Sequence, residues 1–145
     1  MKHLGSKIQA LMYGRCTEKS GDTFTKFYSD RSKAEIYIEN SVLLHNQGFS
    51  VARPYSIKEN VRGLFGLSYT GITMPKLDGL EINLFDGYNH LDFEYTAKEL
   101  ARKELDRAHS LGWNIPSFVS EQYNHIIYNP ETNKVSFISL DHWKL

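Results

Sequence analysis

The stretch YNHIIYNPETNKVSFISLDHW, Tyr123–Trp143, gives the strongest indication of the fold. Its runs HIIY and VSFIS are rich in β-branched and aromatic residues, and the turn-forming segment NPETNK separates them. This pattern predicts an antiparallel hairpin, because so short a connection cannot join parallel strands. Asn124 precedes the hairpin, whereas Ser139 and Asp141 follow it, so polar groups gather at one end. On an extended strand Asp141 would share a face with Ser139, since side chains alternate with a period of two.

The composition is that of an ordinary globular protein of 145 residues. Hydrophobic residues make up 41% and aromatic residues 13%, which is enough to bury a core. The 17 basic and 17 acidic side chains cancel, so we expect neither a nucleic-acid partner nor binding to an anionic membrane. The single cysteine, Cys16, excludes an internal disulfide, and no apolar run reaches the roughly 18 residues of a membrane span. We therefore expect a soluble, cytoplasmic protein without a signal peptide.

Four further strands are predicted in the first half of the chain. Segments 7–16 and 23–29 are rich in apolar, aromatic and threonine residues, and the residues TEKSGD between them predict a turn at Ser20-Gly21-Asp22. Segments 55–58 and 64–73 have a similar composition, and we expect the residues KENVRG to form the turn that joins them. A connector with Pro75 and Gly79 follows.

Two helices are predicted. Ser32 and Glu35 form a capping-box pattern that predicts the start of the first helix, and Gly48 predicts its end. Segment 80–93 is ambiguous and favours a loop with a short helix, whereas segment 94–111 has the pattern of an amphipathic helix. The expected buried residues of the first helix are Ala34, Ile38, Val42 and His45. Those of the second are Ala97, Leu100, Ala101, Leu105, Ala108 and Leu111.

The order β-β-α-β-β, connector, α, β-β predicts an α+β fold. We expect a small antiparallel sheet with one helix in residues 1–75. It is joined to a reduced, partly helical part in residues 76–145 that ends in the hairpin. The two parts are expected to make one compact bilobal protein.

This order resembles the protein kinase-like fold, including its aminoglycoside-phosphotransferase-type relatives. The segment TFTKF, residues 23–27, resembles the strand that carries the phosphate-binding lysine of the family, which implies this role for Lys26. The helix that follows resembles the family helix whose glutamate pairs with that lysine, which implies that Glu39 is the partner of Lys26. Such a pair would fix a flexible ammonium group where it meets phosphate oxygens.

The second half of the chain carries the rest of the resemblance. ITMPKLDG, residues 72–79, resembles the interlobe hinge, which implies that Met74 and Lys76 bind the adenine edge of a nucleotide through backbone groups. ELARKELDRAHSLGW resembles the long helix of the large lobe. The hairpin resembles the strand pair beneath the nucleotide, which implies that Asn124 contacts the nucleotide and a metal ion.

Several family features are missing. The family has an aspartate five residues before the metal-binding asparagine, whereas this chain has Val119 five residues before Asn124. Ser139 stands where the second metal carboxylate of the family is expected. A strict glycine-rich loop is absent, and Leu145 follows shortly after the hairpin, so we expect a truncated large lobe.

Two carboxylates remain as candidate substitutes. Asp141 is a candidate metal ligand and catalytic group, and Glu121, three residues before Asn124, is a candidate unorthodox base. If neither residue acts as a metal ligand or a base, the rate of phosphoryl transfer should fall by orders of magnitude, because that reaction depends on metal ions and a positioned base.

These departures favour a degenerate, pseudokinase-like protein that regulates or inhibits a partner protein by binding, rather than an enzyme. One alternative is a minimal kinase that depends on ATP and Mg and uses Lys26, Glu39, Asn124 and Asp141. Another alternative is an unrelated small α+β interaction module. ATP and Mg are the only cofactors implied. We expect another protein or a second copy, as in a homodimer, to be the partner, because a shortened lobe would leave apolar surface uncovered.

Overall fold

The computed structural model describes residues 15–63, 66–83 and 91–145, which form two compact units. Unit 1 comprises Met1–Ser41 and Arg53–Lys76, and unit 2 comprises Val42–Ala52 and Leu77–Leu145. Each unit is described by itself.

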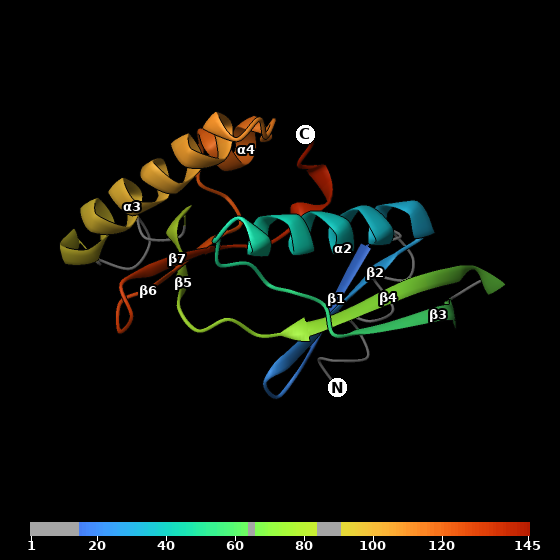
Figure 1. The fold of residues 1–145 in the computed structure, drawn as a ribbon. Coiled ribbons are helices and arrows are strands. Elements are labelled where there is room, and N and C mark those ends of the chain that lie inside the picture. Colours follow the sequence, from blue (N-terminus) through green and yellow to red (C-terminus); the bar gives the residue numbers. More distant parts are fainter. Residues whose placement is uncertain (1–14, 64–65, 84–90) are drawn as a thin grey trace. The chain divides into compact units, whose positions relative to one another are not determined.

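Unit 1 contains a four-stranded antiparallel sheet in the order β1-β2-β4-β3 (Figure 1). Its strands are β1 (Arg15–Ser20), β2 (Thr23–Tyr28), β3 (Ser56–Arg62) and β4 (Ser68–Pro75). The first hairpin is confirmed, and Ser20 pairs with Thr23 across a two-residue turn. Gly21 has a φ of 59° there, which glycine adopts without strain. The turn is shorter than expected because residues 17–19 belong to β1, and the expected strand residues 7–14 lie outside the described residues.

The second hairpin of unit 1 differs from the prediction. The expected turn KENVRG is wrong, because these residues continue β3 to Arg62 through an irregularity between Lys58 and Val61. Asn60 has a φ of 57° within it. The turn lies later, where the Gly63 N–H donates to the Leu67 carbonyl oxygen at 2.8 Å. Polar residues are tolerated in β3 because it is an edge strand whose residues are mostly exposed.

Helix α2 (Arg31–Asn46) starts at a different cap from the expected one. The Asp30 carboxylate accepts the N–H of Ser32 at 2.9 Å and its hydroxyl at 2.7 Å. The predicted capping box is therefore wrong, because Ser32 lies inside the helix and Asp30 satisfies its first turn. The end of the helix is as expected, with Gly48 at a φ of 89°.

The buried face of α2 also differs from the prediction. Ala34 is buried as expected, but Val42 and His45 are exposed and Ile38 is half-buried. The buried residues of the helix are Ala34, Tyr37, Asn40, Ser41 and Leu44.

Unit 2 contains a three-stranded sheet in the order β5-β6-β7 and the long helix α3 (Leu91–Ser110) (Figure 1). The strands are β5 (Leu80–Glu81), β6 (Ile126–Asn129) and β7 (Lys134–Phe137). The predicted hairpin is confirmed, with Asn129 paired to Lys134 at its turn. β5 was expected as loop, and two residues are too few to show an alternating pattern. Residues 84–90 of the ambiguous segment lie outside the described residues.

Helix α3 confirms the predicted amphipathic helix. Its fully buried residues are Ala97, Ala101, Leu105 and Ala108. Leu100 is only half-buried and Leu111, just beyond the helix, is exposed. Two short elements were not predicted, α4 (Ser117–Ser120) and the 3-10 helix η3 (Leu140–His142).

The described residues thus form an α+β protein with two small antiparallel sheets and three α-helices, which is the fold class expected. No helix in this part of the chain is long and apolar enough to cross a membrane.

Candidate functional site

Lys26 of unit 1 lies against two aromatic rings. Its Nζ is 5.2 Å from the ring centroid of Tyr28 and 5.8 Å from that of Tyr37. Tyr28 is two residues further along β2 and shares the face of Lys26, whereas Tyr37 comes from α2. Both tyrosines are 1% exposed, and Lys26 itself is half-buried. The side chain that was expected to bind phosphate therefore lies beside aromatic rings.

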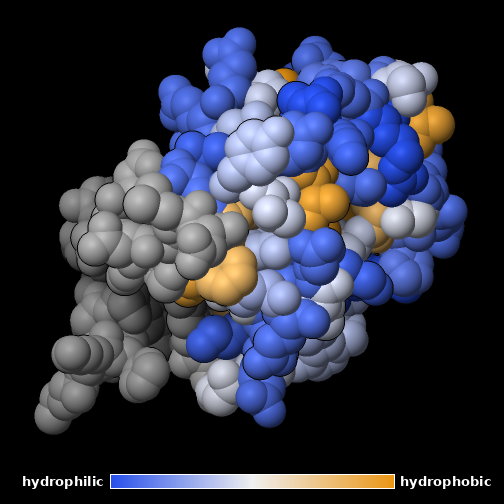
Figure 2. Space-filling view, turned by 90° about the vertical axis from the view of Figure 1, so that its left-hand side faces the viewer, coloured by the Kyte–Doolittle hydropathy of each residue, from blue (hydrophilic) through white to orange (hydrophobic). Residues whose placement is uncertain are grey.

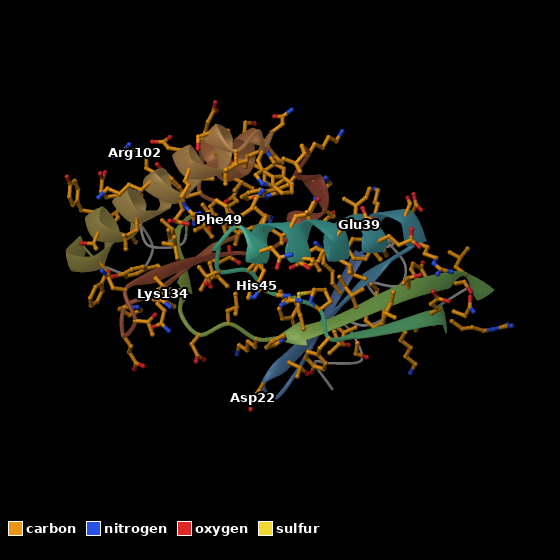
Figure 3. The ribbon with its side chains drawn as sticks, in the orientation of Figure 1. Asp22, Glu39, His45, Phe49, Arg102 and Lys134 are labelled. Atoms are coloured by element: carbon orange, nitrogen blue, oxygen red, sulfur yellow. The ribbon has the colours of Figure 1, made fainter. Side chains whose placement is uncertain are left out.

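Glu39 was expected to form an ion pair with Lys26. Glu39 is exposed on α2 (Figure 3). It lies two residues from Tyr37, which is about 200° of helix rotation, so it faces away from the side that Tyr37 buries. The orientation of α2 therefore does not favour the expected pair, and both the pairing with Lys26 and the assignment of Glu39 to nucleotide binding stay predictions.

The two hinge residues differ in their surroundings. Met74 is fully buried, and its sulfur accepts a hydrogen bond from the Tyr37 hydroxyl at 3.2 Å. Lys76 is exposed, and its N–H donates to the Asp22 carbonyl oxygen at 2.7 Å. The Lys76 N–H therefore already has a hydrogen-bond acceptor inside unit 1. The binding of an adenine edge by Met74 and Lys76 stays a prediction.

Val119 and Asn124 of unit 2 lie in one tight loop. The Tyr123 N–H donates to the Val119 carbonyl oxygen at 3.0 Å, and the Asn124 N–H donates to the Phe118 carbonyl oxygen at 2.9 Å. Val119 lies in α4 and is 1% exposed, so its apolar side chain is buried. The Asn124 amide donates to the Gln122 side-chain oxygen at 3.2 Å. Glu121, the candidate base, is exposed just after α4.

The backbone turns sharply after β7. Ser139 has φ 58° and ψ 52°, which is the left-handed region, and Leu140–His142 then form η3. The expectation that Asp141 shares a face with Ser139 on an extended strand is wrong, because the strand ends at Phe137. Left-handed non-glycine residues are uncommon and often mark functional positions.

Asp141 is buried, and its side chain is 1% exposed. Its carboxylate lies 3.2 Å from the Nε2 of His142, whose side chain is 35% exposed. The phenyl ring of Phe118 packs edge-on against His142 at 5.9 Å and against His125 at 5.7 Å, measured between ring centroids. The Ile138 N–H donates to the His125 carbonyl oxygen at 3.1 Å. These contacts bring together the segments that carry Asn124, Ser139 and Asp141.

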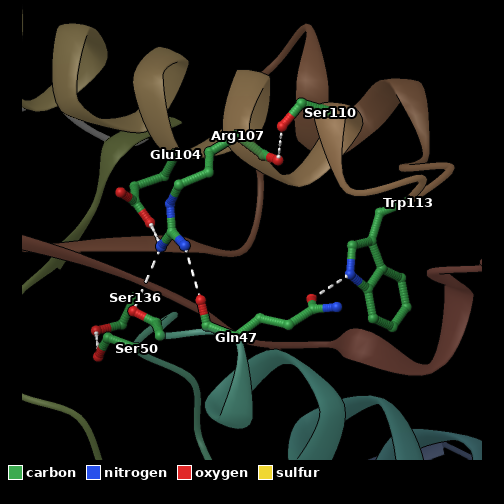
Figure 4. A network of polar contacts seen from close by, with 8 residues as sticks. Gln47, Ser50, Glu104, Arg107, Ser110, Trp113 and Ser136 are labelled. Atoms are coloured by element: carbon green, nitrogen blue, oxygen red, sulfur yellow. Dashed lines mark hydrogen bonds and ion pairs between the residues drawn. The ribbon is translucent and has the colours of Figure 1, made fainter.

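A polar network anchors the chain beside β7 (Figure 4). The Arg107 guanidinium donates to the carbonyl oxygens of Gln47 at 2.8 Å and Gly48 at 3.3 Å, and it lies 3.7 Å from the ring centroid of Phe49. The Ser50 and Ser136 hydroxyls are 2.6 Å apart. The Phe137 N–H donates to the Ser50 carbonyl oxygen at 2.9 Å. The end of β7, and hence the turn at Ser139, is held by these contacts.

The residues present offer few ligands for the metal site that the resemblance implies. Within either unit, the described His, Cys, Asp and Glu side chains do not gather in a group of three or more that could hold a metal ion. Mg²⁺ prefers several oxygen ligands, usually with carboxylates among them, and Ser139 offers only a neutral hydroxyl. The assignment of Asn124 and Asp141 as metal ligands stays a prediction.

Sequence reasoning missed Tyr37, Phe118 and His142. The signal for Tyr37 was present, because Ala34, Tyr37, Ser41 and Leu44 recur at helical spacing. The packing of Phe118 between two imidazoles had no sequence signal, since it depends on how two loops meet.

The arrangement defines a class of fold. A small antiparallel sheet with one helix is followed by a long helix, a loop and a hairpin, and this is the protein kinase-like fold. No protein-family model matches the sequence, and a search of curated proteins gives no significant match.

Particular solved structures share this fold. The bifunctional kinase-methyltransferase WbdD matches with a TM-score of 0.60 and 14% identity, over 99% of this chain and 33% of WbdD. WaaP in complex with acyl carrier protein matches with a TM-score of 0.58 and 16% identity, over 94% of this chain and 65% of WaaP. Aminoglycoside phosphotransferase APH(3'')-Id from Streptomyces rimosus matches with a TM-score of 0.53 and 14% identity, over 90% of this chain and 68% of that protein. The chain thus spans about a third of WbdD and about two thirds of the other two. At these identities the likeness shows the fold alone.

Proposed function

We propose that this chain is a degenerate, pseudokinase-like domain that regulates a partner protein by binding and does not transfer phosphate. The observation that supports this most is Val119. It stands at the position where the resemblance implies a catalytic aspartate, and its apolar side chain is buried in α4. A valine cannot accept a proton or orient an acceptor hydroxyl.

The expected loss in the rate of phosphoryl transfer supports the same proposal. A positioned base contributes roughly 10²- to 10⁴-fold in rate, and each metal contact contributes several kcal/mol. Because about 1.4 kcal/mol is a factor of ten, replacing both carboxylates lowers phosphoryl transfer by several orders of magnitude. Ser139 is the second replaced position, and its neutral hydroxyl is a weak ligand for a hard cation.

The proposed partner is another protein or a second copy of this chain. On the face shown in Figure 2, the described residues are mostly hydrophilic, with hydrophobic residues in small separate groups. One pair of exposed apolar side chains in unit 2 is Leu80, at 41% exposure, and Phe93, at 42%. Both are neighbours of Tyr128, which pairs with Leu80 and lies 6.4 Å from the Phe93 ring. Sedimentation of the chain at increasing concentration tests self-association, and a monomer throughout leaves a different protein as the proposed partner.

Substitutions at Ser139 test whether a metal site has been lost there. Its left-handed backbone conformation can accept two substitutions that differ only in charge. Asp and Asn both tolerate the left-handed region, so neither should disturb the turn. We expect calorimetry to show no Mg-dependent ATP binding by the wild type or by Ser139→Asn, and measurable Mg-dependent binding by Ser139→Asp. Equal behaviour of the two variants would mean that Ser139 does not occupy the metal position. Micromolar, Mg-dependent ATP binding by the wild type that Lys26→Ala abolishes would contradict the proposal that the metal site has been lost.

The second candidate is a minimal kinase that depends on ATP and Mg. The Asp141 carboxylate favours it, because this acidic group is buried just after the left-handed turn, and a buried polar side chain is a more informative sign of a site than an exposed one. Phosphate transfer that Asp141→Ala abolishes, with folding retained, would establish this candidate.

A further inference from the structure

Lys26 is placed by a helix residue other than the one the resemblance indicates. Its ammonium lies within about 6 Å of the ring centroids of Tyr28 and Tyr37, which is the range of an attractive cation–π contact. The two rings come from different elements, β2 and α2. They therefore restrict the side chain from two directions.

Both rings are themselves fixed. Each tyrosine is 1% exposed, and the Tyr37 hydroxyl donates to the Met74 sulfur at 3.2 Å, which ties α2 to β4. A buried aromatic ring loses little further freedom when it contacts a cation, so the contact positions Lys26 at small entropic cost.

Glu39 cannot share this task while α2 keeps its present orientation. For its carboxylate to reach the sheet, the helix would have to rotate by nearly half a turn. Such a rotation would expose the buried side chains of Ala34 and Tyr37, and that loss of burial opposes it.

We propose that Tyr37, together with Tyr28, positions the Lys26 ammonium, and that Glu39 does not. Tyr37 is then a positioning residue of the candidate site. This inference rests on the kinase-like resemblance for the task of Lys26. Its test uses the protein without nucleotide, so failure of this inference can be distinguished from failure of the proposed function.

The first measurement is the rate at which an amine-directed acylating reagent labels Lys26, followed by mass spectrometry of the folded protein. We expect Tyr37→Leu to raise this rate about two- to fivefold, because the lost cation–π contact no longer holds the protonated amine. Tyr37→Phe keeps the ring and should stay close to the wild-type rate. Glu39→Gln is the matched control on the same helix and should leave the rate unchanged.

The second measurement does not need the Tyr37→Leu variant to fold. Protons that lie over an aromatic ring resonate upfield, so the εCH₂ protons of Lys26 should resonate upfield of those of Lys58, an exposed lysine on β3. We expect this ring-current shift in the wild type, in Tyr37→Phe and in Glu39→Gln. Its absence from the wild type, or its loss in Glu39→Gln, would overturn the proposal. So would a labelling rate that rises in Glu39→Gln as much as in Tyr37→Leu.

Discussion

Replacing Arg107 by alanine should destabilise unit 2 markedly, because one side chain makes three kinds of contact there, of which Figure 4 shows the hydrogen bonds and the ion pair. It donates two hydrogen bonds to the carbonyl oxygens of Gln47 and Gly48, covers the ring of Phe49, and pairs with Glu104 at 2.7 Å. It also places a positive charge near the carbonyl end of α2, where the helix dipole favours cations.

The magnitude follows from these contacts. A hydrogen bond with a charged donor contributes about 1.5 kcal/mol at the lower end of its range, and the cation–π contact contributes about 0.5–1 kcal/mol. The ion pair contributes under about 1 kcal/mol, since the Arg107 side chain is 38% exposed and water screens it. Water also replaces part of the lost hydrogen bonding, so we expect Arg107→Ala to lower the free energy of unfolding by about 2–3 kcal/mol.

Urea unfolding followed by tryptophan fluorescence is the assay, because Trp113 and Trp143 both lie in unit 2 and their rings are 6.0 Å apart. Arg107→Lys keeps the charge but loses the two-pronged geometry, and should cost about half as much. Glu104→Gln removes only the ion pair and should cost less than about 1 kcal/mol. A cost of Arg107→Ala below about 0.5 kcal/mol, or a cost of Glu104→Gln equal to it, would refute the reasoning.

Two further predictions concern a glycine and the side chain that caps α2. Gly79 has a φ of 130°, and an added Cβ would lie 2.8 Å from the carbonyl carbon of Tyr128, so Gly79→Ala should cost more than about 2 kcal/mol in urea unfolding. Gly21→Ala is its control, since Gly21 has a φ of 59° with nothing within 4 Å, and should cost about 1–2 kcal/mol; equal costs would contradict the steric explanation. Hydrogen bonds from the side chain and backbone of Ser32 hold the pKa of Asp30 below its ordinary value of 3.8. The resulting stabilisation is present above that ordinary value and is lost as the pH falls through the lower pKa of the folded state. Thermal unfolding at decreasing pH should therefore show a steeper loss of stability for the wild type than for Asp30→Ala, and parallel curves would disprove the cap.

The most regular elements could be predicted from the sequence. Helix α3 has one apolar stripe, so helical spacing indicates both its existence and its buried face. The hairpin β6–β7 has two β-rich runs around a strong turn signal, which fixes its pairing.

Helix α2 shows where spacing fails. Its apolar residues lie on several sides, and Ile36 and Leu43 are 39% and 42% exposed, so hydrophobicity alone does not identify the inner face. The buried positions include Tyr37 and Ser41, whose polar groups find partners in the fold.

The candidate site was predictable only in part. The spacing of Val119 and Asn124 within one loop could be read from the sequence, and hydrogen bonds close that loop. The turn at Ser139 could not, because a left-handed serine has no sequence signature comparable to that of glycine. The burial of Asp141 against His142 depends on that turn.

The measurement that tests the central proposal most directly is the turnover of radiolabelled Mg-ATP by the full chain, followed as ADP release and as label on the protein. We expect no transfer above the background of a protein-free control, and the same result for Lys26→Ala and Asp141→Ala. Mg-dependent transfer by the wild type that both substitutions abolish, with the fold retained, would contradict the proposal and show that the chain is a kinase.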